Sequence, residues 1–168
     1  MKIPVFVSRP TTLNEAQTSS YEIILEELDR LGLEARRLGD SDYPSEFPLR
    51  EVYVLAKHCS GGVILGFEQV FLASGISKRG TGPESEKSLT SLSFPSPWNQ
   101  LEAGILFSLG VPLLVFKEVT ISGGVFDPGV SDVFIHRMPY PNMPPAERAA
   151  VAAVFLKWQA RVSLLYYQ

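Results

Sequence analysis

The chain has 168 residues, of which 45% are hydrophobic, which is enough for one domain with a buried core. Lysine and arginine together number 15 and aspartate and glutamate 18, so the formal net charge is −3. This weakly acidic balance argues against a nucleic-acid scaffold, which would carry a basic stripe. The single cysteine, Cys59, excludes an internal disulfide and a zinc cluster and favours a reducing, cytoplasmic environment.

The apolar segments predict neither a signal peptide nor a membrane span. Residues 3–7 form only a short apolar run, which polar residues soon follow. The longest apolar run, residues 103–116, is interrupted by Gly110 and Pro112 and is shorter than a bilayer requires. We therefore expect a single domain over residues 1–168 that makes no contact with a membrane.

Hydrophobic periodicity predicts strands that alternate with helices along the chain. The expected order is strand 2–8, helix 13–31, strand 33–38, helix 48–58, strand 62–65, helix 97–109, a strand ending at 116, strand 133–136 and helix 145–165. Residues 68–95 show no sustained period, so we expect a long loop there, of the kind that often serves as a lid or a binding loop.

This order predicts an α/β fold: a flavodoxin-like five-stranded parallel sheet with strand order 2-1-3-4-5 and helices on both faces. In such sheets, ligands bind at the carboxyl ends of the strands beside the point where the strand order reverses. We expect the residues that follow strands 2–8, 33–38 and 62–65 to gather at that edge, together with the start of helix 97–109.

The start of the 97–109 helix carries the most informative side chains. Ser96 is a suitable N-cap and Pro97 fits the first helical position. Spacings of three and four residues place Trp98, Asn99 and Glu102 on one surface. The residues expected to face the core instead are Leu101, Ile105, Ser108 and Leu109.

The charge of Glu102 bears on its chemistry. Because a helix N-terminus favours an ionised carboxylate, we expect Glu102 to suit a nucleophile or a stabiliser of positive charge better than a general acid. The alternative from spacing alone is a polar helix edge, with Trp98 packed in the core and Glu102 solvated.

Two family resemblances rest on this region. The pattern Glu102-x-Gly104, followed by the turn at residues 109–112 and an apolar strand, resembles the nucleoside 2-deoxyribosyltransferase-like superfamily. The spacing Ser96-x-Trp98-x-x-x-Glu102 also resembles the corresponding helix of TIR domains, in which a glutamate serves NAD cleavage. Residues 5–17 are similar to the first strand and following loop of the transferases. The similarities cover about half the chain, and both families share the 2-1-3-4-5 sheet.

The resemblance implies an N-glycosidic-bond hydrolase or transferase that acts on a nucleoside, a nucleotide or an NAD-like molecule. Glu102 would be its catalytic nucleophile or would stabilise an oxocarbenium-like transition state. No cofactor or metal is implied, and NAD is a candidate substrate. The partner would be a small molecule rather than nucleic acid or a membrane.

The candidate substrate-binding residues are Ser8, Arg9, Asp42, Glu68, Trp98 and Asn99. Trp98 would stack on the departing base and Asn99 would hydrogen-bond it. Asp42, or its neighbour Asp40, would bind ribose hydroxyls, and Arg9 would bind a phosphate. The alternative for Arg9 is an exposed loop charge, and the alternative for the two aspartates is turn formation.

A second hypothesis is a non-catalytic nucleotide sensor. The transferases carry an aspartate around the third strand, whereas the segment Cys59–Leu65 holds no acid and the next is Glu68. A third is a self-associating TIR-like module, a homo-oligomer that would use the last helix and the Tyr166-Tyr167 end of the chain.

Overall fold

A computed structural model describes residues 2–39 and 47–168. Its main sheet is parallel, with the order β2-β1-β3-β6-β7. The five strands are β1 (Ile3–Ser8), β2 (Leu33–Arg36), β3 (Gly62–Gly66), β6 (Leu113–Lys117) and β7 (Ile135–Arg137). Numbered by themselves, these strands have the order 2-1-3-4-5, so the predicted flavodoxin-like class is confirmed.

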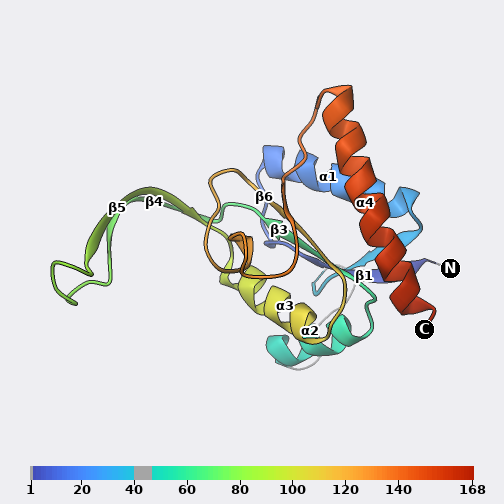
Figure 1. Cartoon of the computed structure of the whole chain (residues 1–168), viewed down its shortest axis with the longest axis horizontal. Coiled ribbons are helices and arrows are strands. Elements are labelled where there is room, and N and C mark those ends of the chain that lie inside the picture. Colours follow the sequence, from blue (N-terminus) through green and yellow to red (C-terminus); the bar gives the residue numbers. More distant parts are fainter. Residues whose placement is uncertain (1, 40–46) are drawn as a thin grey trace.

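Helices cover both faces of this sheet (Figure 1). α1 (Glu15–Arg30) and α4 (Pro145–Tyr166) pack on one face, where Phe116 of β6 stacks on Phe155 of α4 at 5.5 Å between ring centroids. α2 (Pro48–Lys57) and α3 (Pro97–Ser108) cover the other face. A 3₁₀ turn, Gly124–Phe126, packs into the same core through Phe126. Among the described helices, none has the length and apolar character needed to cross a membrane.

Local chemistry explains where α1 begins. The side chain of Asn14 accepts a hydrogen bond from the Gln17 backbone at 2.8 Å, and the Gln17 side chain accepts one from the Asn14 backbone at 3.2 Å. This reciprocal capping box satisfies two backbone donors that would otherwise lack partners. The helix therefore starts at Glu15, two residues later than the apolar pattern suggests.

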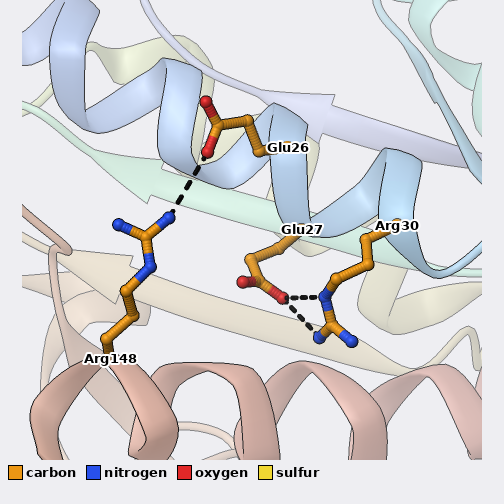
Figure 2. A network of polar contacts seen from close by, with 4 residues as sticks. All are labelled: Glu26, Glu27, Arg30 and Arg148. Atoms are coloured by element: carbon orange, nitrogen blue, oxygen red, sulfur yellow. Dashed lines mark hydrogen bonds and ion pairs between the residues drawn. The ribbon is translucent and has the colours of Figure 1, made fainter. Parts of the chain in front are cut away.

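One ion pair joins α1 to α4, and a second lies within α1 beside it (Figure 2). Arg148 of α4 reaches Glu26 of α1 at 3.5 Å, while Arg30 binds Glu27 within α1 at 2.6 Å. An exposed pair such as Arg148–Glu26 typically contributes about 0–1 kcal/mol, whereas the Glu27 carboxylate is largely buried. The buried aromatic and aliphatic contacts between the sheet and the two helices therefore matter more for holding the layer together.

The segment expected to be a loop contains an antiparallel hairpin, formed by β4 (Val70–Ser77) and β5 (Lys87–Phe94). It projects from the body of the molecule as a two-stranded arm (Figure 1). Its residues do not follow an apolar-in, polar-out alternation, because neither face of the arm is buried in the core. That missing alternation is why the period-based prediction of a loop was wrong here.

A close contact between a glycine and α4 gives a test of the packing. A Cβ atom added at Gly61 would lie 2.6 Å from Val162 and 2.8 Å from Trp158. We expect Gly61→Ala to lower the free energy of unfolding by about 1–3 kcal/mol through overpacking. Gly104→Ala is the matched control: nothing lies within 4 Å, so it should raise stability by up to about 1 kcal/mol. Urea unfolding of both variants measures the difference, and equal effects would contradict this packing.

Candidate functional site

The start of α3 forms as its sequence predicts. Ser96 is the N-cap, and its hydroxyl accepts a hydrogen bond from the Trp98 backbone at 3.2 Å. Pro97 occupies the first turn, where no helical N–H partner is needed. The cap places the next two turns of α3 against the carboxyl ends of β1 and β3, since Asn99 contacts residues of both strands.

The face of α3 that packs on the sheet differs from the prediction. The buried side chains are Asn99, Ala103 and Leu106, whereas Leu101 and Ser108 are exposed and Ile105 and Leu109 are half-buried. The helix is apolar on several sides, so composition does not reveal which side faces the core. A buried hydrogen bond from Asn99, which apolar periodicity does not register, accompanies the observed orientation.

Asn99 joins three elements through one amide group. Its side chain is 1% exposed, and its Nδ2 donates to the Ser8 hydroxyl at 2.8 Å and to the Leu65 carbonyl at 3.3 Å. Ser8 ends β1 and Leu65 lies near the end of β3, so the amide ties α3 to the point where the strand order reverses. The Asn99 Oδ1 atom is buried and has no hydrogen-bond partner within the described part of the chain.

Ser8 links Asn99 to Glu102 through hydrogen bonds. Its hydroxyl accepts from Asn99 and donates to the Glu102 carboxyl group. A serine hydroxyl has one hydrogen to donate and can also accept, so both contacts can form together. Asn99, Ser8 and Glu102 are therefore a connected chain of polar groups at the ligand-binding edge of the sheet.

Desolvation controls the charge of Glu102. Burial raises the pKa of its carboxyl group from 4.5 to about 7, although the Ser8 hydrogen bond and the positive charge of Arg37 both lower it. The helix N-terminus was expected to favour the ionised carboxylate, whereas burial favours the protonated form. Glu102 lies in the second helical turn, where the helix dipole is already weak, and the loss of water outweighs it. The group therefore titrates near neutral pH, where it can donate or accept a proton.

Trp98 and Arg9 are the sequence neighbours of Asn99 and Ser8 in this chain of groups. Trp98 is 43% exposed, so the alternative in which it is packed in the core is wrong. The Arg9 guanidinium donates to the Pro10 carbonyl at 2.6 Å and to the Thr11 carbonyl at 3.2 Å, and lies 4.5 Å from the Tyr21 ring centroid. These contacts connect the guanidinium to α1 and to its own loop. Asp40 and Asp42 lie outside the described residues.

Glu68 takes part in a network at the base of the arm. Its carboxylate accepts from the Ser93 hydroxyl, and its backbone N–H donates to the Glu118 carboxylate at 2.6 Å. Gln17 of α1 donates to the Glu68 carbonyl at 3.1 Å and reaches Glu118 at 3.3 Å. These contacts anchor the arm to α1 and to the end of β6, which is an architectural role.

Arg37 is a site residue that the sequence-based candidates lack. It follows β2, is only 8% exposed, and its charge reaches Glu102. The signal that was available is a pair of arginines at the carboxyl end of a predicted strand, the edge where ligands bind. Within residues 2–39 and 47–168, no three histidine, cysteine, aspartate or glutamate side chains converge to hold a metal ion.

The described residues form several cavities that lie away from Glu102. One of about 280 Å³ lies between α3 and the turn after β6, where Phe107 and Val125 line it. Another of about 180 Å³ lies between β7 and α4, lined by His136 and Tyr140 among others. Glu102 lines neither of them.

Comparison with known proteins found no relative of this chain. No family model, curated protein or solved structure matches this chain. The interpretation of the site therefore rests on its geometry and on the chemistry of its residues.

The raised pKa of Glu102 gives stability a pH dependence of definite sign. The folded chain holds the proton up to about pH 7, whereas an unfolded glutamate loses it near 4.5. The contribution of Glu102 is fully present below the lower value and is lost as pH rises through the higher one. In the parent protein this loss lowers the free energy of unfolding by up to about 3 kcal/mol as pH rises. We expect Glu102→Gln to lack this decrease. Urea unfolding at about pH 5 and about pH 8 measures it; identical pH dependence in both proteins would contradict the burial of this carboxyl group.

Proposed function

We propose that the protein is an enzyme that cleaves or transfers the N-glycosidic bond of a nucleoside, a nucleotide or an NAD-like molecule, with Glu102 as its reacting carboxyl group. The observation that carries the proposal is a desolvated carboxyl group, with a pKa of about 7, at the strand-order switch of a flavodoxin-like sheet. Perturbed carboxyl groups at such edges are typical of catalytic sites. The resemblance of residues 96–116 to transferases and TIR domains points to the same chemistry.

The ionised form of Glu102 supplies the first step. A carboxylate oxygen attacks the anomeric carbon of the sugar, or stabilises the positive charge that develops there. The carbon–nitrogen bond breaks, and its electron pair leaves with the base. The base of a nucleoside or nucleotide then takes a proton from water, whereas the cationic ring of an NAD-like molecule leaves as a neutral base without one. Water then cleaves the glycosyl ester in a hydrolase, whereas the nitrogen of a second base attacks it in a transferase.

The neighbouring residues have distinct proposed roles. The exposed ring of Trp98 offers a surface on which the base can stack. Asn99 is too buried to bind the base readily, so it is better suited to position Ser8 and, through Ser8, Glu102. Arg9 would bind a phosphate only after giving up its contacts with the loop carbonyls. Asp42 stays a proposed ribose ligand.

A binding-only role is the second candidate, and the state of Glu68 favours it. The acid nearest the expected third-strand position is held by Ser93 at the base of the arm. It is therefore poorly placed to activate a water molecule beside Glu102. In this alternative the same edge would bind a nucleotide as a signal without cleaving it.

One variant separates these two functions. Incubation of the protein with a panel of nucleosides, nucleotides and NAD, followed by chromatography of the products, should release a free base in at least one case. We expect Glu102→Gln to reduce turnover by a factor of about 10³ or more while calorimetry still detects binding. Because the ionised form is the nucleophile, kcat/KM of the parent should rise with pH through about 7.

The exposed Glu34 of β2 provides a matched control, because Glu34→Gln makes the same chemical change away from the site. Full activity of Glu102→Gln would exclude Glu102 as the reacting group. Binding without any product after long incubation would instead favour the sensor.

A further inference from the structure

The arm formed by β4 and β5 has no partner beyond its own base in the described structure. It extends from the body as an isolated two-stranded ribbon (Figure 1). Apolar side chains along it are exposed, including Val70 at 55% and Ile76 at 54%. A lone hairpin is at best marginally stable in water, and exposed apolar strands tend to mark interaction sites.

The two edges of the arm differ in their capacity to pair. The edge of β5 is interrupted, because Ser91 has a φ of 53° and Ser93 bridges to Ile121 of the body. β4 contains neither a charged residue nor a proline in its eight residues, and none of its residues has a positive φ. Natural edge strands are usually protected by charges, prolines or bulges. The edge of β4 lacks these devices and is suited to accept another strand.

The base of the arm is held firmly enough to present this edge. The hydrogen bonds that Glu68 makes with Ser93 and Glu118, together with those of Gln17, fix both strands where they leave the body. An edge that is already ordered loses less conformational entropy when it binds a partner. The ordered base of the arm therefore favours association through the edge of β4.

We infer that β4 pairs with β4 of a second copy of this chain, antiparallel and about a two-fold axis, to form a four-stranded sheet. Pairing of identical strands about such an axis places one residue opposite its own copy. An axis at Ala73, near the middle of β4, pairs seven of the eight residues. This is strand addition in which the added strand comes from an identical protein.

The side chains along β4 favour this register. It places Val70 opposite Ile76 of the partner subunit, so two exposed apolar side chains cover each other, and it does so twice. It also places Phe71 opposite Gly75 of the partner subunit, where an aromatic ring can cover a glycine at a sheet edge. Both contacts remove apolar surface from water.

Charge complementarity supports a second copy as the occupant. Continued beyond the strand, the same register brings Lys78 at the tip of one arm towards Glu68 of the partner subunit, at the base of the other. A register with its axis one residue later, at Ser74, instead places Lys78 beside Val70 of the partner subunit. In the first register the charge of Lys78 therefore meets an opposite charge on the antiparallel second arm.

Sedimentation velocity from micromolar to near-millimolar concentration tests the dimer. We expect the parent protein to dimerise and each of Val70→Glu and Ile76→Lys to raise the dissociation constant at least about tenfold. The double variant places opposite charges across the two-fold axis and should restore dimerisation. Leu164→Glu changes an exposed apolar residue of α4 and should leave the dimer unchanged. Circular dichroism checks that every variant stays folded.

Oxidative cross-linking tests the register. Ala73→Cys should form a disulfide-linked dimer, because residue 73 faces its own copy, whereas Ser74→Cys should cross-link at least about tenfold more slowly. The native Cys59 is buried and gives little background. A monomeric parent at all concentrations, a dimer lost only in Leu164→Glu, or faster cross-linking at 74 than at 73 would overturn the inference.

Discussion

The amide of Asn99 is the interaction on which the candidate site depends. It binds Ser8 at the end of β1 and the Leu65 carbonyl near the end of β3, and thereby fixes α3 at the strand-order switch. A buried amide without such partners would cost about 1–3 kcal/mol, so the hydrogen bonds select one orientation of the helix. That orientation places Glu102 beside Ser8 and leaves the Trp98 ring exposed at the helix start.

The chemistry of Glu102 follows from a balance between two opposed effects. Removal of water favours the protonated carboxyl group, whereas the Ser8 hydroxyl and the charge of Arg37 favour the ionised one. Because desolvation is the larger effect, the group titrates near neutral pH and can change its protonation state during a reaction. A solvated glutamate on an ordinary helix edge would remain ionised at neutral pH and could not readily donate a proton there.

Local rules predict the sheet and most helix ends well, because strands that are buried on both faces and capped helices leave direct signals in sequence. The apolar run Gly62–Leu65 and the Ser96-Pro97 start of α3 are examples. The orientation of α3 is less accessible, because a buried polar contact of Asn99 contributes to it. The arm is also missed: neither of its faces joins the core, so its strands lack the alternation that identifies a half-buried sheet. The effect of Arg37 on Glu102 could not be predicted, because the two residues are far apart in sequence and only the fold brings the charge of Arg37 close enough to act on Glu102.

The arm and the site share one junction, because β3, the arm and α3 follow one another in the chain. Glu68 and Ser93 secure the arm where it leaves the sheet. Ser96, three residues after Ser93, caps the helix that carries Glu102. The insertion therefore extends the chain outward without displacing the helix from the strand ends. Assembly through the arm and chemistry at Glu102 can be varied separately, since they use different side chains.

The pKa of Glu102 tests the central claim most directly. Carbon-13 NMR of the glutamate carboxyl groups, with Glu102→Gln to assign the signal, follows its titration without a known substrate. We expect a midpoint near 7, and a higher midpoint in Ser8→Ala because a hydrogen bond to the ionised form is lost. A midpoint near 4.5 that does not respond to Ser8→Ala would contradict it.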